Sequence, residues 1–157
     1  MTLIASNIAQ QKDYEQITYG VDIGGTKIEI GLFSPELKLI DSWRTATPTE
    51  NYNEFINTIV ELIVEADRRC QQKGVVGIGM PGILDKNGRV KSANVPCATG
   101  KNIIKDLNKA LDSEIAIGND CRLFALSESV GGAGDNHRRV YGAIIGTGAA
   151  GGFCIDG

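Results

Sequence analysis

The stretch Asp22-Ile-Gly-Gly-Thr-Lys27 stands between two runs of alternating apolar residues. A run, a glycine pair and a second run predict a β-hairpin, because Gly24 and Gly25 can take the positive φ that a tight turn between twisted strands demands. The turn also carries a carboxylate, a hydroxyl and an ammonium beside backbone N–H groups that no side chain shields. Such a turn suits a phosphate chain and its metal: amides and Lys27 oppose negative charge, and Asp22 can orient Mg²⁺ or its water shell. An ordinary hairpin with polar decoration fits these six residues equally well.

Strand and helix patterns continue outward from this turn. Strands are predicted at 17–23, 27–33, 37–44, 74–80 and 114–118, and helices at 52–70, 102–111 and 120–130. The first three strands follow one another directly, which predicts an antiparallel meander. Each later strand is reached through a helix, as a parallel strand requires. The order predicts an α/β fold with one mixed five-stranded sheet and helices on both faces.

The end of the chain repeats its opening pattern. Two further strands, 139–145 and 151–155, flank Gly146-Thr-Gly148, and no helix follows them. We therefore expect a flexible leader at 1–16, a first lobe at 17–135, and the first hairpin of a second lobe at 136–157, whose remainder is absent.

Composition excludes several classes of protein. The 157 residues are 42% hydrophobic and 22% charged, with a formal net charge of −3. These values are typical of globular proteins, and the negative net charge gives no sign of a basic surface that would bind nucleic acid or an anionic membrane. No apolar run reaches the roughly 20 residues that span a bilayer. The four cysteines are scattered and there is one histidine, so reduced thiols in the cytoplasm are favoured over a zinc site.

Five motifs in this order resemble the ROK sugar kinases and their repressor relatives, which are built on the actin-like ATPase (ribonuclease H-like) fold. The motifs are Asp22-Ile-Gly-Gly-Thr-Lys27, Gly77-Ile-Gly-Met-Pro-Gly82, Ser92-Ala-Asn-Val-Pro96, Asn119-Asp120 with Phe124-Ala-Leu-Ser-Glu128, and Gly146-Thr-Gly-Ala-Ala-Gly-Gly152. The resemblance implies that this chain is the N-terminal lobe of such a protein. In the family a second lobe carries most of the adenosine site and a structural zinc, and this chain holds no ligands for that zinc.

The resemblance assigns the catalytic base to Asp120. At the start of a helix the dipole favours an ionised carboxylate, which can accept the proton of an attacking sugar hydroxyl. The alternative is a helix-capping aspartate. By the same resemblance Asn94, Asn119 and Gly82 contact the sugar, although an asparagine that shapes its own loop also fits Asn94, and a plain strand stop also fits Gly82.

ATP with Mg²⁺ is the implied cofactor. By resemblance its phosphates are bound from both hairpins, by Asp22, Gly24, Gly25, Thr26 and Lys27 in the first and by Gly146, Thr147 and Gly148 in the second. Two stretches differ from the usual family pattern, Cys121-Arg122 after the proposed base and Ala149-Ala150 after the second glycine turn. These differences bear on the phosphate geometry and on the choice of sugar.

The predicted activity is ATP-dependent phosphorylation of the 6-hydroxyl of a hexose or amino sugar. Residues 93–96, 99–101 and 124–128 look most like bacterial N-acetyl-D-glucosamine kinases, whereas 128–134 look like the manno(fructo)kinase branch. The alternatives are another sugar kinase of the family, namely a fructokinase, mannokinase or glucokinase, and a sugar-responsive transcriptional regulator. We expect a sugar and ATP as partners, no nucleic acid and no membrane, with a homodimer left open. The chain alone is expected to be inactive.

Overall fold

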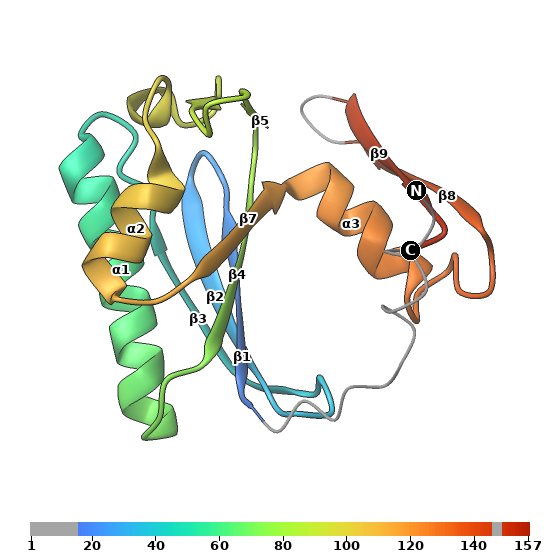
Figure 1. The fold of residues 1–157 in the computed structure, drawn as a ribbon, viewed down its shortest axis with the longest axis horizontal. Helices are drawn as coiled ribbons and strands as arrows, with labels where there is room; N and C mark the ends of the chain where they lie inside the picture. The colour runs from blue at the N-terminus through green and yellow to red at the C-terminus, as the bar shows by residue number, and fades with distance from the viewer. Residues whose placement is uncertain (1–15, 146–148) are drawn as a thin grey trace. The chain divides into compact units, whose positions relative to one another are not determined.

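The structure, a computed structural model, describes residues 16–145 and 149–157. The described residues form two compact units, one up to Asn119 and one from Asp120 onward. The first unit contains a five-stranded sheet and two helices, and the second contains one helix and a hairpin (Figure 1). The predicted lobe boundary after residue 135 concerns the domains of the whole protein and stays a prediction.

The sheet of the first unit is mixed, as predicted. Its strands are β1 (Thr18–Ile23), β2 (Lys27–Phe33), β3 (Leu39–Ala46), β4 (Val75–Met80) and β7 (Ile115–Asn119). Their spatial order is β3-β2-β1-β4-β7. The meander β1-β2-β3 is antiparallel, whereas β4 pairs parallel with β1 and β7 pairs parallel with β4. The crossover helices between β1, β4 and β7 account for this, because parallel neighbours cannot be joined by a tight turn.

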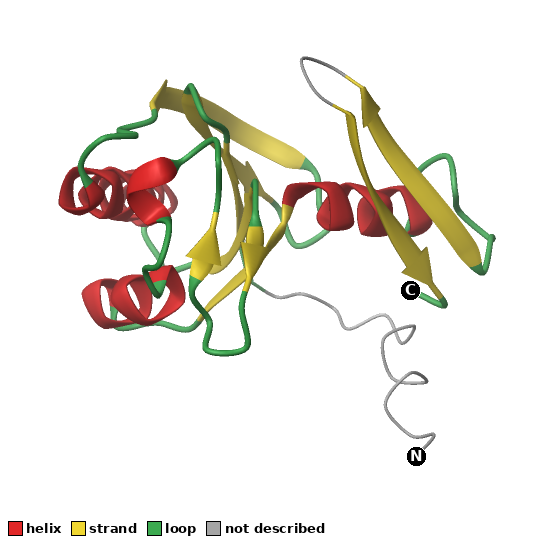
Figure 2. Ribbon diagram, turned by 90° about the horizontal axis from the view of Figure 1, so that it is seen from above, coloured by secondary structure: helices red, strands yellow, loops and turns green. Residues whose placement is uncertain are grey.

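One face of this sheet carries the core. Helix α1 (Tyr52–Cys70) and helix α2 (Ile103–Leu111) both pack on it, and Figure 2 shows the two helices as a layer beside the strands. Alternate strand residues point into this layer, and they are buried together with the apolar stripes of both helices. The strand members are Tyr19, Val21, Ile23, Ile28, Ile30, Leu32, Val76, Ile78, Met80 and Ile115. The alternation read from the sequence therefore identifies the core face.

The third strand begins two residues later than predicted. Leu37 has φ of 58°, a left-handed conformation that strands do not contain. Its N–H donates to the carbonyl of Ser34 at 2.8 Å, and the Ser34 N–H donates to the Lys38 carbonyl at 2.9 Å. These bonds make residues 34–38 a turn, so the apolar side chain of Leu37 belongs to the turn and not to β3.

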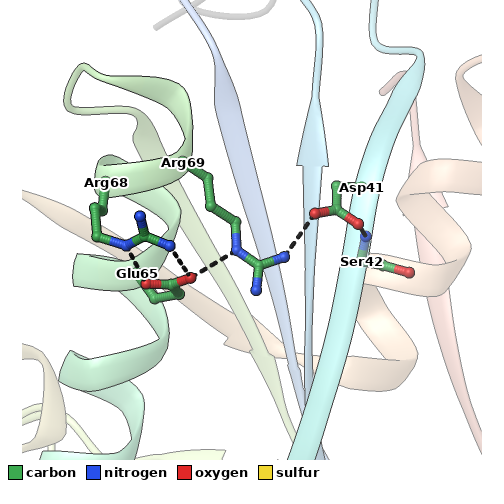
Figure 3. Close-up of polar contacts among 5 residues, drawn as sticks. All are labelled: Asp41, Ser42, Glu65, Arg68 and Arg69. Atoms are coloured by element: carbon green, nitrogen blue, oxygen red, sulfur yellow. Dashed lines mark hydrogen bonds and ion pairs between the residues drawn. The ribbon is translucent and has the colours of Figure 1, made fainter.

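A polar cluster joins α1 to β3, which is an edge strand of the sheet (Figure 3). Arg69 bonds Asp41 of β3 through Nη1 at 2.7 Å and Glu65 of its own helix through Nε at 2.8 Å. Arg68 bonds the same glutamate at 2.7 and 2.8 Å. The Arg69 guanidinium also stacks over Trp43 of β3, 3.9 Å from the ring centroid. The edge strand is thus held by charge and stacking where its residues are mostly exposed.

Three short elements follow β4, namely β5 (Ile83–Leu84), β6 (Val90–Lys91) and the 3₁₀ helix η2 (Pro96–Ala98). The β5-β6 hairpin turns at Gly88, which has φ of +73°. The second unit consists of α3 (Asp120–Ser129), β8 (Arg139–Ile145) and β9 (Ala149–Ile155), in which the two strands pair antiparallel. The predicted second hairpin is confirmed. Within the described residues no helix is long and apolar enough to cross a membrane.

Candidate functional site

The predicted site residues of the first unit gather at one edge of the sheet. Strands β1, β4 and β7 are parallel, so their carboxyl ends lie together. Asp22 pairs with Gly79, which pairs with Gly118, and in the next row Met80 pairs with Asn119. In open α/β sheets, ligands bind in the crevice beyond this edge. The turns and loops that leave it carry the predicted contacts to phosphate and sugar.

The turn between β1 and β2 is held from outside by the end of β3. The Gly24 N–H donates to the Lys27 carbonyl at 2.8 Å. Thr47 donates its hydroxyl to the carbonyl of Gly24 at 2.8 Å and its N–H to that of Thr26 at 3.0 Å. Because β3 pairs in register with β2, Thr47 comes to lie opposite the turn. Thr47 belongs to none of the motifs in the sequence, and only the strand register indicates its role.

The expected positive φ at Gly24 and Gly25 is wrong. Neither glycine has a left-handed backbone, unlike Gly82 and Gly88. What Gly25 provides instead is space, because a Cβ there would lie 3.0 Å from the carbonyl oxygen and 3.2 Å from the Cβ of Asn94. The turn predicted to bind phosphate therefore touches the loop predicted to bind sugar.

The loop that carries Asn94 is shaped by two hydroxyl groups. Ser92 is buried, and its Oγ accepts the N–H of Val95 at 3.2 Å. The Thr99 hydroxyl donates to the Ser92 carbonyl at 2.9 Å, and the Thr99 Oγ1 atom accepts the Ser92 N–H at 3.2 Å. Val95 is fully buried, whereas Asn94 is exposed between these anchors. The loop thus presents Asn94 from a fixed backbone.

Gly82 and Asn119 are brought together. Gly82 follows β4 and has φ of +118°. Asn119 ends β7, and its Nδ2 donates to the Gly82 carbonyl at 2.9 Å. A Cβ at residue 82 would lie only 2.5 Å from the carbonyl oxygen of Lys91. Gly82 therefore needs to be glycine because of both its backbone angle and its close neighbour.

Two charged residues flank the turn. Asp22 is exposed, and its place in β1 puts it on the sheet face opposite to the core residues Val21 and Ile23. Lys27 Nζ forms an ion pair with Glu29 Oε2 at 3.0 Å, and the two side chains are 50% and 40% exposed. Because an exposed pair of this kind contributes little free energy, Lys27 can exchange its partner for a phosphate at small cost.

Asp120 is the first residue of α3 in the second unit. Its Oδ1 accepts the N–H of Cys121 at 2.9 Å. Burial raises the pKa of the Cys121 thiol, and the neighbouring Asp120 carboxylate raises it further. The thiol beside the predicted base therefore stays protonated, so it adds no second negative charge there.

The hairpin of the second unit packs closely on α3. A Cβ at Gly142 would lie 2.9 Å from the Phe124 ring, and one at Gly152 would lie 2.6 Å from the Cys121 carbonyl oxygen. The predicted phosphate residues Gly146, Thr147 and Gly148 lie outside the described residues. Within residues 16–145 and 149–157, no group of three or more His, Cys, Asp or Glu side chains could hold a metal ion.

A model of the ROK family matches residues 18–157. The chain belongs to the ROK family. An N-acetylgalactosamine kinase, AgaK, from Shewanella sp. (strain ANA-3) is 50% identical over 139 residues, which are 88% of this chain and 45% of that protein. An N-acetyl-D-glucosamine kinase from Citrobacter koseri is 43% identical over 140 residues, 88% of this chain and 46% of that protein.

The fold comparison agrees with this membership. A ROK family glucokinase from Streptomyces griseus, solved in complex with glucose and AMPPNP, superposes with a TM-score of 0.77 at 29% identity, covering 89% of this chain and 45% of the glucokinase. The predicted family and the actin-like ATPase fold are thereby confirmed. The chain spans about half the length of the ROK relatives that it matches.

Proposed function

We propose that this protein is an ATP-dependent kinase that phosphorylates the 6-hydroxyl of an N-acetylated amino sugar, with N-acetyl-D-glucosamine as the first candidate. The observation that carries this proposal is the contact between Gly25 and Asn94, because it puts a phosphate-type glycine turn beside an exposed amide that can bind sugar hydroxyls. The names of the relatives, at 50% and 43% identity, support the amino-sugar substrate.

In this proposal the first hairpin binds the phosphates of ATP. The N–H groups of Gly25 and Thr26 face the phosphate oxygens, the Gly24 N–H closes the turn onto the Lys27 carbonyl, and the Lys27 side chain supplies an ammonium. Residues 146–148 are proposed to do the same from the second hairpin. The magnesium that arrives with ATP suits the exposed Asp22, because carboxylate oxygen is the donor that this ion prefers. The AMPPNP bound in the glucokinase complex supports ATP as the phosphate donor.

Asp120 is proposed as the general base. Its carboxylate accepts the proton of the sugar 6-hydroxyl while that oxygen attacks the γ-phosphorus. A new phosphorus–oxygen bond forms to the sugar, and the bond from the γ-phosphorus to the oxygen shared with the β-phosphate breaks, which releases ADP. Asn94 and Asn119 orient the sugar. The hydrogen bond from Asn119 to Gly82 holds the Asn119 side chain at the sheet edge.

A second candidate substrate is N-acetyl-D-galactosamine. It is favoured by the 50% identity to a kinase named for that sugar. The two sugars differ only in the orientation of the 4-hydroxyl, which a positioned amide can discriminate by hydrogen bonding. We propose the cytoplasm as the site of action, because all four cysteines are free thiols, as a reducing compartment maintains them.

The test is ADP release by the full-length protein with N-acetylglucosamine, N-acetylgalactosamine, glucose, mannose and fructose. We expect the highest kcat/KM with one of the two acetylated sugars. Asp120→Asn should lower kcat by about 10²–10⁴-fold, the usual contribution of a general base. Asp112→Asn is the control, because Asp112 is exposed at the left-handed C-cap of α2, a position that asparagine also suits.

Two results would contradict the proposal. An unchanged rate in Asp120→Asn would remove that residue as the base. No turnover with any sugar would favour the sugar-responsive regulator instead.

A further inference from the structure

The contact between Gly25 and Asn94 joins two segments that lie far apart in the chain. A Cβ at residue 25 would approach the Asn94 carbonyl oxygen to 3.0 Å and the Asn94 Cβ to 3.2 Å. Both distances are shorter than van der Waals contact, so a methyl group there fits only if one segment moves by a few tenths of an ångström. Which segment can move decides what the glycine is for.

The Asn94 loop is anchored on both sides of the contact. Val95 is fully buried, its N–H is bonded to the Ser92 hydroxyl, and its carbonyl accepts the N–H of Ala98 at 3.1 Å. Ser92 is in turn clamped by two hydrogen bonds to Thr99. Because the nearest atom to the added Cβ is the Asn94 carbonyl oxygen, the added methyl group would push on residue 94 itself, between its anchors, and would shift the amide that this residue carries.

The turn is anchored as well. Thr47 bonds the carbonyls of Gly24 and Thr26, which flank Gly25 on both sides. The Gly24 N–H closes the turn onto the Lys27 carbonyl. The turn therefore cannot swing away from the loop without losing its hydrogen bonds to Thr47, the residue that follows β3.

We propose that Gly25 is a positioning residue for Asn94, so that the phosphate turn and the sugar loop act as one rigid element. This inference rests on the proposed function and adds to it that Gly25 governs sugar binding. Gly24 provides the contrast within the same turn. A Cβ at Gly24 would meet only the Lys27 carbonyl oxygen, at 3.2 Å, and would not touch Asn94.

The kinetic test compares Gly25→Ala with Gly24→Ala in the full-length protein. We expect Gly25→Ala to raise KM for the sugar by about fivefold or more, because small misplacements of a binding group are costly, with a smaller change in KM for ATP. Gly24→Ala should change KM for ATP more than KM for the sugar. Equal effects of Gly25→Ala on both KM values, or an effect on ATP alone, would overturn the proposal.

A double-mutant cycle tests whether the effect passes through Asn94. In an Asn94→Ala background, Gly25→Ala should change KM for the sugar by less than about twofold, because the backbone of residue 94 is still displaced but no longer carries the amide that binds the sugar. The same fivefold change in both backgrounds would overturn the proposal.

A measurement without turnover separates this inference from the proposed function. In the unliganded protein the Asn94 side-chain amide resonance should shift more in Gly25→Ala than in Gly24→Ala, whether or not the protein is a kinase. If Gly25→Ala does not fold, the unsubstituted protein is titrated with N-acetylglucosamine alone. The Gly25 amide resonance should then move more than that of Gly24, and an unmoved Gly25 resonance would overturn the proposal.

Discussion

Glycine serves two different purposes at the candidate site. Gly82 has a left-handed backbone and lies against the carbonyl of Lys91, whereas Gly25 has an ordinary backbone and lies against Asn94. The first position restricts the residue through its φ angle, the second only through space. A motif read in one dimension cannot tell these two demands apart.

Gly82→Ala should therefore destabilise the protein. A φ of +118° is strained for any residue with a side chain and costs roughly 1–3 kcal/mol in the free energy of unfolding. The added Cβ would also lie 2.5 Å from the Lys91 carbonyl oxygen, so the backbone of residue 82, whose own carbonyl accepts the Asn119 amide, would have to shift. Urea unfolding measures the loss.

Gly77→Ala is the control in the strand before it. Gly77 has no positive φ, and a Cβ there meets nothing within 4 Å. Alanine should stabilise this strand by roughly 0.5–1 kcal/mol, because glycine loses more conformational freedom on folding. A change in the free energy of unfolding with the same sign in Gly82→Ala and Gly77→Ala would contradict this account of Gly82.

At the scale of elements, the edge strand β3 has two tasks. Its end holds the turn of the site through Thr47, and its middle is held to α1 through Arg69. Helix α1 itself begins at a well-formed cap, in which the Asn51 side chain accepts the N–H groups of Asn53 and Glu54. The position of the turn therefore depends on a helix packed against the edge strand.

The ion-pair cluster on α1 predicts a pH dependence of stability. Hydrogen bonds from Arg68 and then Arg69 lower the pKa of Glu65 from 4.5 to about 2. A carboxyl group with a lower pKa in the folded state contributes stability that is present above its unfolded pKa and is lost as the pH falls through the folded pKa. The difference in free energy of unfolding between the unsubstituted protein and Glu65→Gln should therefore shrink between about pH 5 and pH 2.

Glu61→Gln provides the comparison on the same helix. Glu61 is exposed and makes no ion pair among the described residues. Chemical unfolding at low salt, repeated across this pH range, gives both differences. A difference for Glu65→Gln that stays constant with pH would show that the arginines do not hold this carboxylate in solution.

At the scale of the whole molecule, the two units differ in how well they bury apolar surface. The main core cluster lies entirely in the first unit. The second unit turns one face of its hairpin toward α3 and leaves the other open, with Ile145 86% and Phe153 72% exposed. Among the described residues β8 and β9 pair only with each other, so each strand also has a free edge.

We therefore expect this 157-residue chain to self-associate, because exposed apolar strands with free edges recruit further strands. Phe153 pairs with Tyr141 across the hairpin, with ring centroids 4.6 Å apart. Phe153→Lys should lower the weight-average molecular mass that sedimentation equilibrium measures at high protein concentration. Val130→Lys, at a 68% exposed residue of the same unit beyond α3, should not. A monomer at all concentrations would contradict this prediction.

Much of the fold could be predicted from local pattern. The helices over 52–70 and 102–111 and the strands of both hairpins follow from the spacing of apolar residues, which is encoded within short windows. The failure at Leu37 has the same origin, because an apolar residue that takes a left-handed turn looks like part of the strand beside it. The motif around Asn119 and Asp120 also marked the junction of β7 and α3 correctly.

The sequence by itself determined the elements, the core face and the family, because alternation, helical spacing and glycine turns act over a few residues. Only the tertiary structure decided that Gly25 meets Asn94, that Thr47 holds the turn, and that Ser92 and Thr99 fix the loop. Those contacts join distant segments, and their distances depend on strand register and on how each loop returns to the sheet. No window of sequence contains that information, because it arises from the packing of the whole unit.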